Sequence, residues 1–161
     1  MKMKMKICLR EARTVDMPLV KKTFVETSWQ YAPETQKKLL DRKKWNTRVT
    51  KYYENVLKGE NSQVFIAEDE QNEYIGHLIV GQTKSVFTEL TSGYVFDVFV
   101  KKKFRRKGIG KTLLKKAEDY LREKGYSRIA LSVLARNDSA ISLYTKIGYK
   151  PERITMTKEI T

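Results

Sequence analysis

Apolar side chains recur along this chain at two different spacings, which predict alternating helices and strands. The clearest helical stripe runs through residues 108–124, where Ile109, Leu113, Ala117 and Leu121 share one face at three- to four-residue spacing. Gly125 follows at the usual position of a helix end. We therefore expect an amphipathic helix there, with this face packed against a core.

Three other segments carry helical signals. Asp16 is a suitable N-terminal cap, and Pro18 is tolerated in the first turn of the helix that follows it. Residues 33–57 form a second helical stretch that we expect to be broken, and residues 137–146 form a short helix that ends before Gly148. The inner face of the first helix is predicted to consist of Leu19, Val20, Phe24 and Thr27.

Short runs rich in β-branched and aromatic residues predict the strands. They comprise residues 7–13, 64–67, 74–81, 94–100, 128–133 and one or two final strands within 149–160. The polar segment 68–73 suits a hairpin connection between its two neighbouring strands. Strands and helices in this order predict one mixed α/β domain over residues 1–161, built around a single twisted sheet.

The positive net charge of the chain indicates an anionic ligand. The chain has 33 Lys and Arg against 19 Asp and Glu, which gives a formal net charge of +14. Such a surface attracts polyanions such as nucleic acid or a phosphorylated cofactor. Seven of the eleven residues 101–111 are Lys or Arg, so this segment needs an explanation of its own.

The lengths of the apolar runs, the N-terminal sequence and the cysteine content favour a cytoplasmic protein without a membrane-spanning helix. No apolar run approaches the ~18 residues of a membrane-spanning helix. The basic N-terminus, MKMKMKICLR, lacks the apolar stretch of a signal peptide, and we expect it to lead into the first strand. The single cysteine, Cys8, allows no internal disulfide, and we expect it to pack in the core.

The basic segment runs into RRKGIGKTLL, residues 105–114, which is typical of a phosphate-binding turn. It is not a P-loop, because Arg105 stands where that motif needs glycine, and Leu113 replaces the third glycine of the dinucleotide fingerprint. A strand precedes it and a helix follows, so unpaired N–H groups and the helix dipole favour an anion there. Because Gly108 and Gly110 lack a Cβ, a ligand can approach their backbone closely.

The segment Arg105-Arg106-Lys107-Gly108-Ile109-Gly110 resembles the acetyl-CoA signature, (R/Q)-x-x-G-x-(G/A), of the GNAT N-acetyltransferase superfamily. Residues 137–149, NDSAISLYTKIGY, are similar to the next motif of that superfamily, an Asn followed seven residues later by a Tyr and then by a Gly-aromatic pair. Both motifs occur in the expected order, and the resemblance covers nearly the whole chain. It implies the acyl-CoA N-acyltransferase fold, a mixed, mostly antiparallel twisted sheet flanked by helices.

The resemblance also implies acetyl-CoA as cosubstrate, without a metal. Its pyrophosphate would rest on the backbone of Arg106, Lys107, Gly108, Ile109, Gly110 and Lys111. Its pantetheine arm would pair like an added strand, at a bulge that splays the neighbouring strands, with Val98, Phe99 and Val100. Asn137 would touch the pantetheine, Tyr144 would stand near the sulfur, and Arg105 would buttress the loop or meet the ribose phosphate.

Direct acetyl transfer sets chemical requirements that particular residues can meet. The backbone N–H of Val98 or Phe99 could polarise the thioester carbonyl. Tyr144 could protonate the departing thiolate, since the ordinary pKa of a phenol is about 10. Asp97 is a carboxylate in an apolar strand and must be hydrogen-bonded, paired or reactive.

The general base is less well determined than the acid. Asp97 could deprotonate the amine through water, or it could only anchor nearby backbone, because many relatives carry the acid one position earlier, where this chain has Phe96. Glu89, just before that strand, is a second candidate. His77, the only histidine, has no partner at metal-ligand spacing, so we interpret it as a structural or surface residue and predict no metal site.

The acceptor site should lie between the N-terminal helices and the middle strands. Candidates for its aromatic lining are Trp29, Tyr31, Trp45, Tyr52, Tyr94 and Phe96. The neighbours Tyr52 and Tyr53 cannot both face inward, so one of the two rings should be exposed.

The leading hypothesis is a cytoplasmic N-acetyltransferase that acts on a primary amine of a small molecule or a protein, in a chain that could form a homodimer. One alternative is a nucleic-acid-binding module, in which the basic residues of 101–111 contact phosphates and Phe104 stacks on a base. The other is a catalytically idle acyl-CoA sensor. The position of the basic run between a strand and a helix start disfavours nucleic acid.

Overall fold

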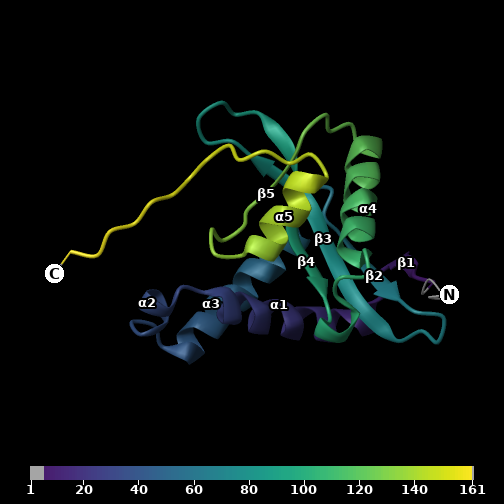
Figure 1. The fold of residues 1–161 in the computed structure, drawn as a ribbon, viewed down its shortest axis with the longest axis horizontal. Helices are drawn as coiled ribbons and strands as arrows, with labels where there is room; N and C mark the ends of the chain where they lie inside the picture. Colours follow the sequence, from purple (N-terminus) through teal and green to yellow (C-terminus); the bar gives the residue numbers. More distant parts are fainter. Residues whose placement is uncertain (1–5, 161) are drawn as a thin grey trace.

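A five-stranded mixed sheet forms the centre of the computed structural model, which describes residues 6–160 (Figure 1). Its strands, in the order in which they lie side by side, are β1 (Cys8–Glu11), β2 (Gln63–Glu68), β3 (Tyr74–Lys84), β4 (Thr91–Val100) and β5 (Ile129–Leu131). Neighbours from β1 to β4 are antiparallel, and β5 is parallel to β4. The predicted mixed, mostly antiparallel sheet is confirmed.

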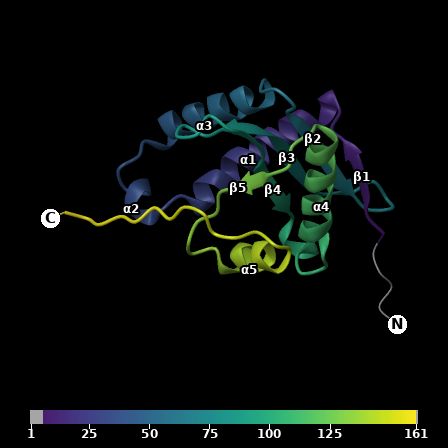
Figure 2. The ribbon, with the colours of Figure 1, turned by 90° about the horizontal axis from the view of Figure 1, so that it is seen from above.

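Helices cover both faces of this sheet. They are α1 (Met17–Tyr31), α2 (Glu34–Lys37), α3 (Arg42–Leu57), α4 (Ile109–Glu123) and α5 (Asp138–Lys146), with short 3₁₀ turns at Thr14–Asp16 and Lys102–Phe104. Figure 2 shows α1 and α3 on one side of the strands and α4 and α5 on the other. None of the helices in residues 6–160 is both long and apolar enough to cross a bilayer.

The two faces of the sheet carry two separate apolar clusters, and strand β3 contributes to both. Leu78 and Val80 pack toward α4, whose buried stripe includes Leu113, whereas the intervening Ile79 packs toward α1 and α3. Successive side chains of a strand point to opposite faces, so a central strand covered on both sides reads as a continuous apolar run. This explains why residues 75–81 are all buried.

The predicted helices are confirmed, with one correction to a buried face. Residues 38–41 interrupt the second helical stretch, and Asp41 then caps α3 by accepting a hydrogen bond from the Lys44 N–H at 2.7 Å. In α1, Val20 and Phe24 are buried, but Leu19 is 45% exposed, contrary to the predicted inner face. Val20 and Phe24 are one turn apart, whereas Leu19 lies about 100° round the helix from Val20.

Two further expectations about burial and strands are wrong. Cys8 is exposed rather than packed in the core, because β1 is an edge strand with β2 as its only neighbour in the sheet. Residues 149–160 contain no strand, and their apolar side chains Ile154 and Met156 are 78% and 89% exposed. β-Branched and aromatic residues suggested a strand, but no described strand lies beside this segment to hydrogen-bond with it. The predicted N-terminal lead-in, residues 1–5, lies outside the described residues.

Gly76 provides a test of the β3–β4 register, in which it lies opposite Val100. A Cβ atom at residue 76 would overlap the backbone carbonyl of Phe99, which no rotamer change can relieve. We therefore expect Gly76→Ala to lower the midpoint of thermal unfolding by roughly 5–10 °C, the effect of about 2–3 kcal/mol in a domain of this size. Lys84→Ala, at the exposed end of the same strand, should leave the midpoint nearly unchanged. Equal midpoints for the two variants would contradict this register.

Candidate active site

A β-bulge at Phe96 is the central feature of the candidate site. Ile79 of β3 pairs with Asp97 of β4, and the next residue of β3, Val80, pairs with Val95. Phe96 is therefore one extra residue in β4 without a partner in β3. Such a bulge bends its strand and changes the direction in which the following side chains and backbone groups point.

Strand β5 accompanies β4 only up to this bulge. The pairs between them are Gly93 with Ile129, Tyr94 with Ala130 and Val95 with Leu131. The edge of β4 from Phe96 to Val100 consequently has no neighbouring strand among the described residues. An unpaired strand edge presents free N–H and C=O groups, so this gap can accept an extended chain as an added strand.

The hydrogen bonds on each side of the bulge identify which N–H group faces the gap. The N–H of Gly93 donates toward β5, to the carbonyl of Arg128, whereas the N–H of Lys101 donates toward β3, to the carbonyl of Ile75. Odd-numbered residues thus change sides at the bulge, so the N–H of Val98 points into the gap and that of Phe99 belongs to the β3 ladder. Of the two predicted donors, the geometry favours Val98.

The basic loop that follows β4 is shaped by its own contacts. The Arg105 Nε donates to the carbonyl of Val100 at 2.8 Å, which ties the loop to the end of β4. Arg106 and Gly108 both have left-handed backbone, with φ of 60° and 82°. Phe104 is only 7% exposed, in the α4 cluster, which contradicts the alternative in which its ring stacks on a nucleic-acid base.

The first turn of α4 offers N–H groups to a ligand. The first hydrogen bond of the helix runs from the Thr112 N–H to the Gly108 carbonyl, so the N–H groups of Ile109, Gly110 and Lys111 precede any helical partner. Space around Gly108 is open, but a Cβ at Gly110 would come within 3.1 Å of Leu143 in α5. The second glycine of the motif therefore also allows α4 and α5 to pack closely.

Helix α5 supplies the two predicted residues of the second motif. Asn137 caps this helix, because its Oδ1 accepts a hydrogen bond from the Ala140 N–H at 3.2 Å, which leaves its amide hydrogens available as donors. The half-buried ring of Tyr144 lies against that of Tyr149, with centroids 5.9 Å apart. Burial, and to a smaller extent the charge of Asp97, raises the pKa of Tyr144 to about 12.

Asp97 is hydrogen-bonded to His77, a contact that the sequence analysis missed. The Asp97 Oδ2 lies 2.8 Å from His77 Nε2, and the His77 ring is fully buried rather than on the surface. The one signal in the sequence was that both residues fall in consecutive strands with a short connection. Their contact depends on the register of the hairpin, which the pattern of residues does not reveal.

Glu89, the second predicted base, lies at the opposite end of the β3–β4 hairpin. It belongs to the turn that precedes β4, its side chain is 83% exposed, and its Oε1 is 3.6 Å from the Lys84 Nζ. This position argues against contact with the gap. No group of His, Cys, Asp and Glu side chains within residues 6–160 is arranged to hold a metal ion.

The aromatic candidates for the acceptor site fall into two groups. Tyr94 and Phe96 lie together beside the bulge, with ring centroids 4.9 Å apart. Tyr52 is 52% exposed, whereas Tyr53 is 3% exposed, which confirms that only one of these neighbours faces inward. The pKa of Tyr52 is raised by burial and by the proximity of Tyr94, so Tyr52 belongs to the group at the bulge.

The second aromatic group lies at the C-terminal end of α1. The rings of Trp29 and Trp45 meet edge to face at 5.1 Å, and the guanidinium of Arg42 lies 4.2 Å from the Trp29 centroid. The Arg136 Nη2, in the segment before α5, donates to the carbonyls of Tyr31 and Ala32 at 2.8 Å each. This contact joins the end of α1 to the segment that leads into α5.

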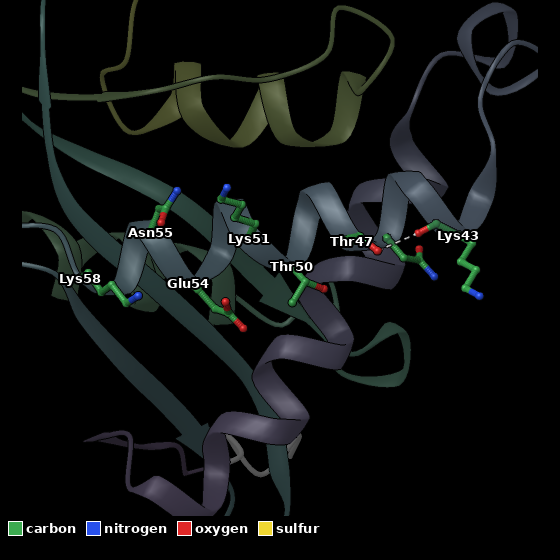
Figure 3. A pocket seen from close by; sticks show the side chains of 8 residues that line it. Lys43, Thr47, Thr50, Lys51, Glu54, Asn55 and Lys58 are labelled. Atoms are coloured by element: carbon green, nitrogen blue, oxygen red, sulfur yellow. Dashed lines mark hydrogen bonds between the residues drawn. The ribbon is translucent and has the colours of Figure 1, made fainter.

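A polar hollow of about 570 Å³ lies apart from the gap, along one helix (Figure 3). Its lining comes from α3 and its C-terminal neighbour alone: Lys43, Asn46, Thr47, Thr50, Lys51, Glu54, Asn55 and Lys58. None of the bulge, basic-loop or α5 residues contributes to it, so we do not count it as part of the candidate site.

The chain is similar in sequence to known acetyltransferases. A model of the acetyltransferase (GNAT) family matches residues 23–149. YuaI, an uncharacterized N-acetyltransferase of Bacillus subtilis (strain 168), is 27% identical over 149 residues, which cover 92% of this chain and 82% of that protein.

Solved structures show the same fold. A Pyrococcus furiosus protein named for acetyl transfer is 27% identical, with a TM-score of 0.80 over 96% of this chain and 100% of that one. A Clostridium acetobutylicum protein, named an acetyltransferase and solved with acetyl-CoA, has a TM-score of 0.71 at 18% identity, over 96% of each chain.

The hydrogen bond from Arg105 to Val100 should hold the basic loop in place. We expect Arg105→Ala to speed hydrogen exchange at the amides of Phe104 and Thr112, whose hydrogen bonds to the carbonyls of Lys101 and Gly108 lie on either side of the loop, because the loop loses its tie to β4. Lys102→Ala removes the same charge from the same region without removing this bond and should leave those rates nearly unchanged. Mass spectrometry of exchanged peptides measures both, and equal rates in the two variants would contradict a role of this bond in ordering the loop.

Proposed function

Because the chain belongs to the GNAT family of acetyltransferases, we propose that it transfers the acetyl group of acetyl-CoA to a primary amine by direct attack. The observation that carries this proposal is the unpaired edge of β4 beside the bulge, which ends at the basic loop and at the free N–H groups of α4. An extended arm and a diphosphate, joined in one ligand, match these two neighbouring sites.

The residues around the gap fit the parts of acetyl-CoA. N–H groups at the start of α4 and the left-handed turn at Arg106 and Gly108 favour the pyrophosphate. The free edge of β4 at Val98 and Val100 suits the amide groups of the pantetheine, and the Asn137 amide hydrogens suit one of its carbonyls. When bound, acetyl-CoA supplies the activated thioester.

Three groups of this chain have the chemistry that the transfer needs. The Val98 N–H donates to the thioester oxygen, where negative charge develops as the amine nitrogen bonds to carbon. The Asp97 carboxylate accepts the proton that the amine loses, directly or through one water. The Tyr144 hydroxyl, which is protonated at neutral pH as an ordinary phenol is, donates its proton to the sulfur as the carbon–sulfur bond breaks.

The acceptor class follows from the neighbours of Asp97. Phe96, which precedes Asp97 in β4, and Tyr94, whose ring lies beside that of Phe96, place aromatic surface at the bulge, an environment that suits an amine on a small molecule or on a protein side chain. The net charge of +14 disfavours acceptors with several positive charges. An amine on a neutral or acidic molecule therefore fits this surface best.

Tyr144→Phe tests the proposed proton donor. Turnover, measured as release of free thiol from acetyl-CoA with a panel of amines, should fall by about 10²–10⁴-fold, because the departing thiolate loses its general acid. The dissociation constant for coenzyme A, measured by calorimetry, should stay the same. Tyr53→Phe, which removes another buried tyrosine hydroxyl in α3, is the control and should retain turnover. Wild-type turnover in Tyr144→Phe would remove Tyr144 from the chemistry.

Asp97→Asn tests the proposed base through the pH dependence of turnover. The wild-type rate should decline toward acid, since protonation of Asp97 and of the amine both stop the reaction. In Asp97→Asn we expect a lower plateau and an acid limb set by the amine alone, so the limb should then vary with the acceptor that is used. A profile identical to that of the wild type would show that Asp97 is not the base.

A further inference from the structure

The only histidine of the chain lies at the centre of a buried hydrogen-bonded chain that ends at Asp97. The Tyr74 hydroxyl is 2.5 Å from His77 Nδ1, and His77 Nε2 is 2.8 Å from the Asp97 Oδ2. The chain crosses from β3 to β4, on the face of the sheet that α1 covers. His77 is fully buried, while the Asp97 side chain is 17% exposed, so the chain links the interior to the gap.

The imidazole ring has two aromatic neighbours. It stacks on Phe99, with centroids 5.5 Å apart and an angle of 27° between planes, whereas the Tyr74 ring, with its centroid 6.2 Å away, meets the edge of the imidazole through its hydroxyl. The stack on Phe99 and the hydrogen bonds at both nitrogens hold the ring in one orientation. Tyr74 and Asp97 are the titratable groups that contact it, one at each nitrogen.

The chemistry of these three groups selects one arrangement of protons. Burial raises the pKa of Tyr74, so its hydroxyl stays protonated and donates a hydrogen bond to Nδ1. Nδ1 must then carry no hydrogen, which puts the imidazole proton on Nε2, where it is donated to the Asp97 carboxylate.

We propose that His77 is a positioning residue for acetyl transfer, which fixes the Asp97 carboxylate beside the bulge by donating a hydrogen bond from Nε2 to Oδ2. This inference rests on the proposed function, in which Asp97 is the base. The bond holds Oδ2 in place and leaves Oδ1 to face the amine. Tyr74 contributes by holding His77 in the donating tautomer, in the way that a second partner orients a catalytic histidine.

The tautomer can be measured without any substrate. Because the chain has one histidine, a protein labelled with ¹⁵N at histidine gives one set of imidazole signals. We expect the neutral ring with its proton on Nε2 at neutral pH, and partial exchange between tautomers in Tyr74→Phe, which removes one oxygen atom. Any other protonation pattern in the wild type would overturn the proposed arrangement.

Two substitutions separate positioning from packing. His77→Phe keeps an aromatic ring between Tyr74 and Phe99 but removes the donor, whereas His77→Gln restores an N–H donor without the ring. We expect His77→Phe to lower kcat by roughly 10- to 100-fold, the usual value of a hydrogen bond to a charged group, with an unchanged dissociation constant for coenzyme A.

His77→Gln should recover most of kcat. A folded His77→Phe protein with wild-type kcat, or equal losses in both variants, would overturn the positioning role. Should His77→Phe not fold, Tyr74→Phe replaces it, with a smaller loss of kcat and the same unchanged dissociation constant for coenzyme A. The control is again Tyr53→Phe, since its hydroxyl has no partner among the described residues.

The results also distinguish a failure of this inference from a failure of the proposed function. If the wild type binds coenzyme A and releases thiol but is indifferent to His77→Phe, only the positioning role fails. If the wild type neither binds coenzyme A nor turns over any amine of the panel, the proposed function fails and the role of His77 in it fails as well.

Discussion

The candidate site depends on a place where hydrogen bonding in the sheet stops. Strands β4 and β5 pair through three residues, and one extra residue at Phe96 then redirects β4. A sheet that remained paired to its end would bury the groups that now face the gap. The bulge has a second effect, since it brings Asp97 to the same face of the sheet as His77 and Phe99. The extra residue Phe96 therefore leaves the edge of β4 unpaired and also positions the Asp97 carboxylate.

Much of the fold could be predicted because its signals are local. The stripe of α4, the break before Asp41 and the glycine turn at Gly108 each depend on residues close together in sequence. The bulge and the bond between His77 and Asp97 depend on strand register, which single residues do not encode. Residues 149–160 show the opposite error, since β-branched and aromatic residues suggested a strand although no described strand lies beside them to pair with.

The Lys and Arg residues of segment 101–111 have more than one structural role. Arg105 is engaged with the backbone of β4, and the ammonium groups of Lys103 and Lys107 lie 4.7 and 5.5 Å from the Phe104 ring centroid. The buried ring of Phe104 fastens the loop to the α4 cluster. The Lys and Arg residues of this segment therefore lie on a backbone that is held in place. This distinguishes the segment from the flexible basic arms that bind along nucleic acids.

The contact between Gly110 and Leu143 has a mechanical meaning. Leu143 immediately precedes Tyr144, so the turn that we propose holds the pyrophosphate packs against the helix that carries the proposed proton donor. Binding free energy from a remote, unreactive part of a substrate can be used to align its reacting atoms. A larger side chain at position 110 would press on Leu143 and so displace the neighbouring Tyr144 hydroxyl.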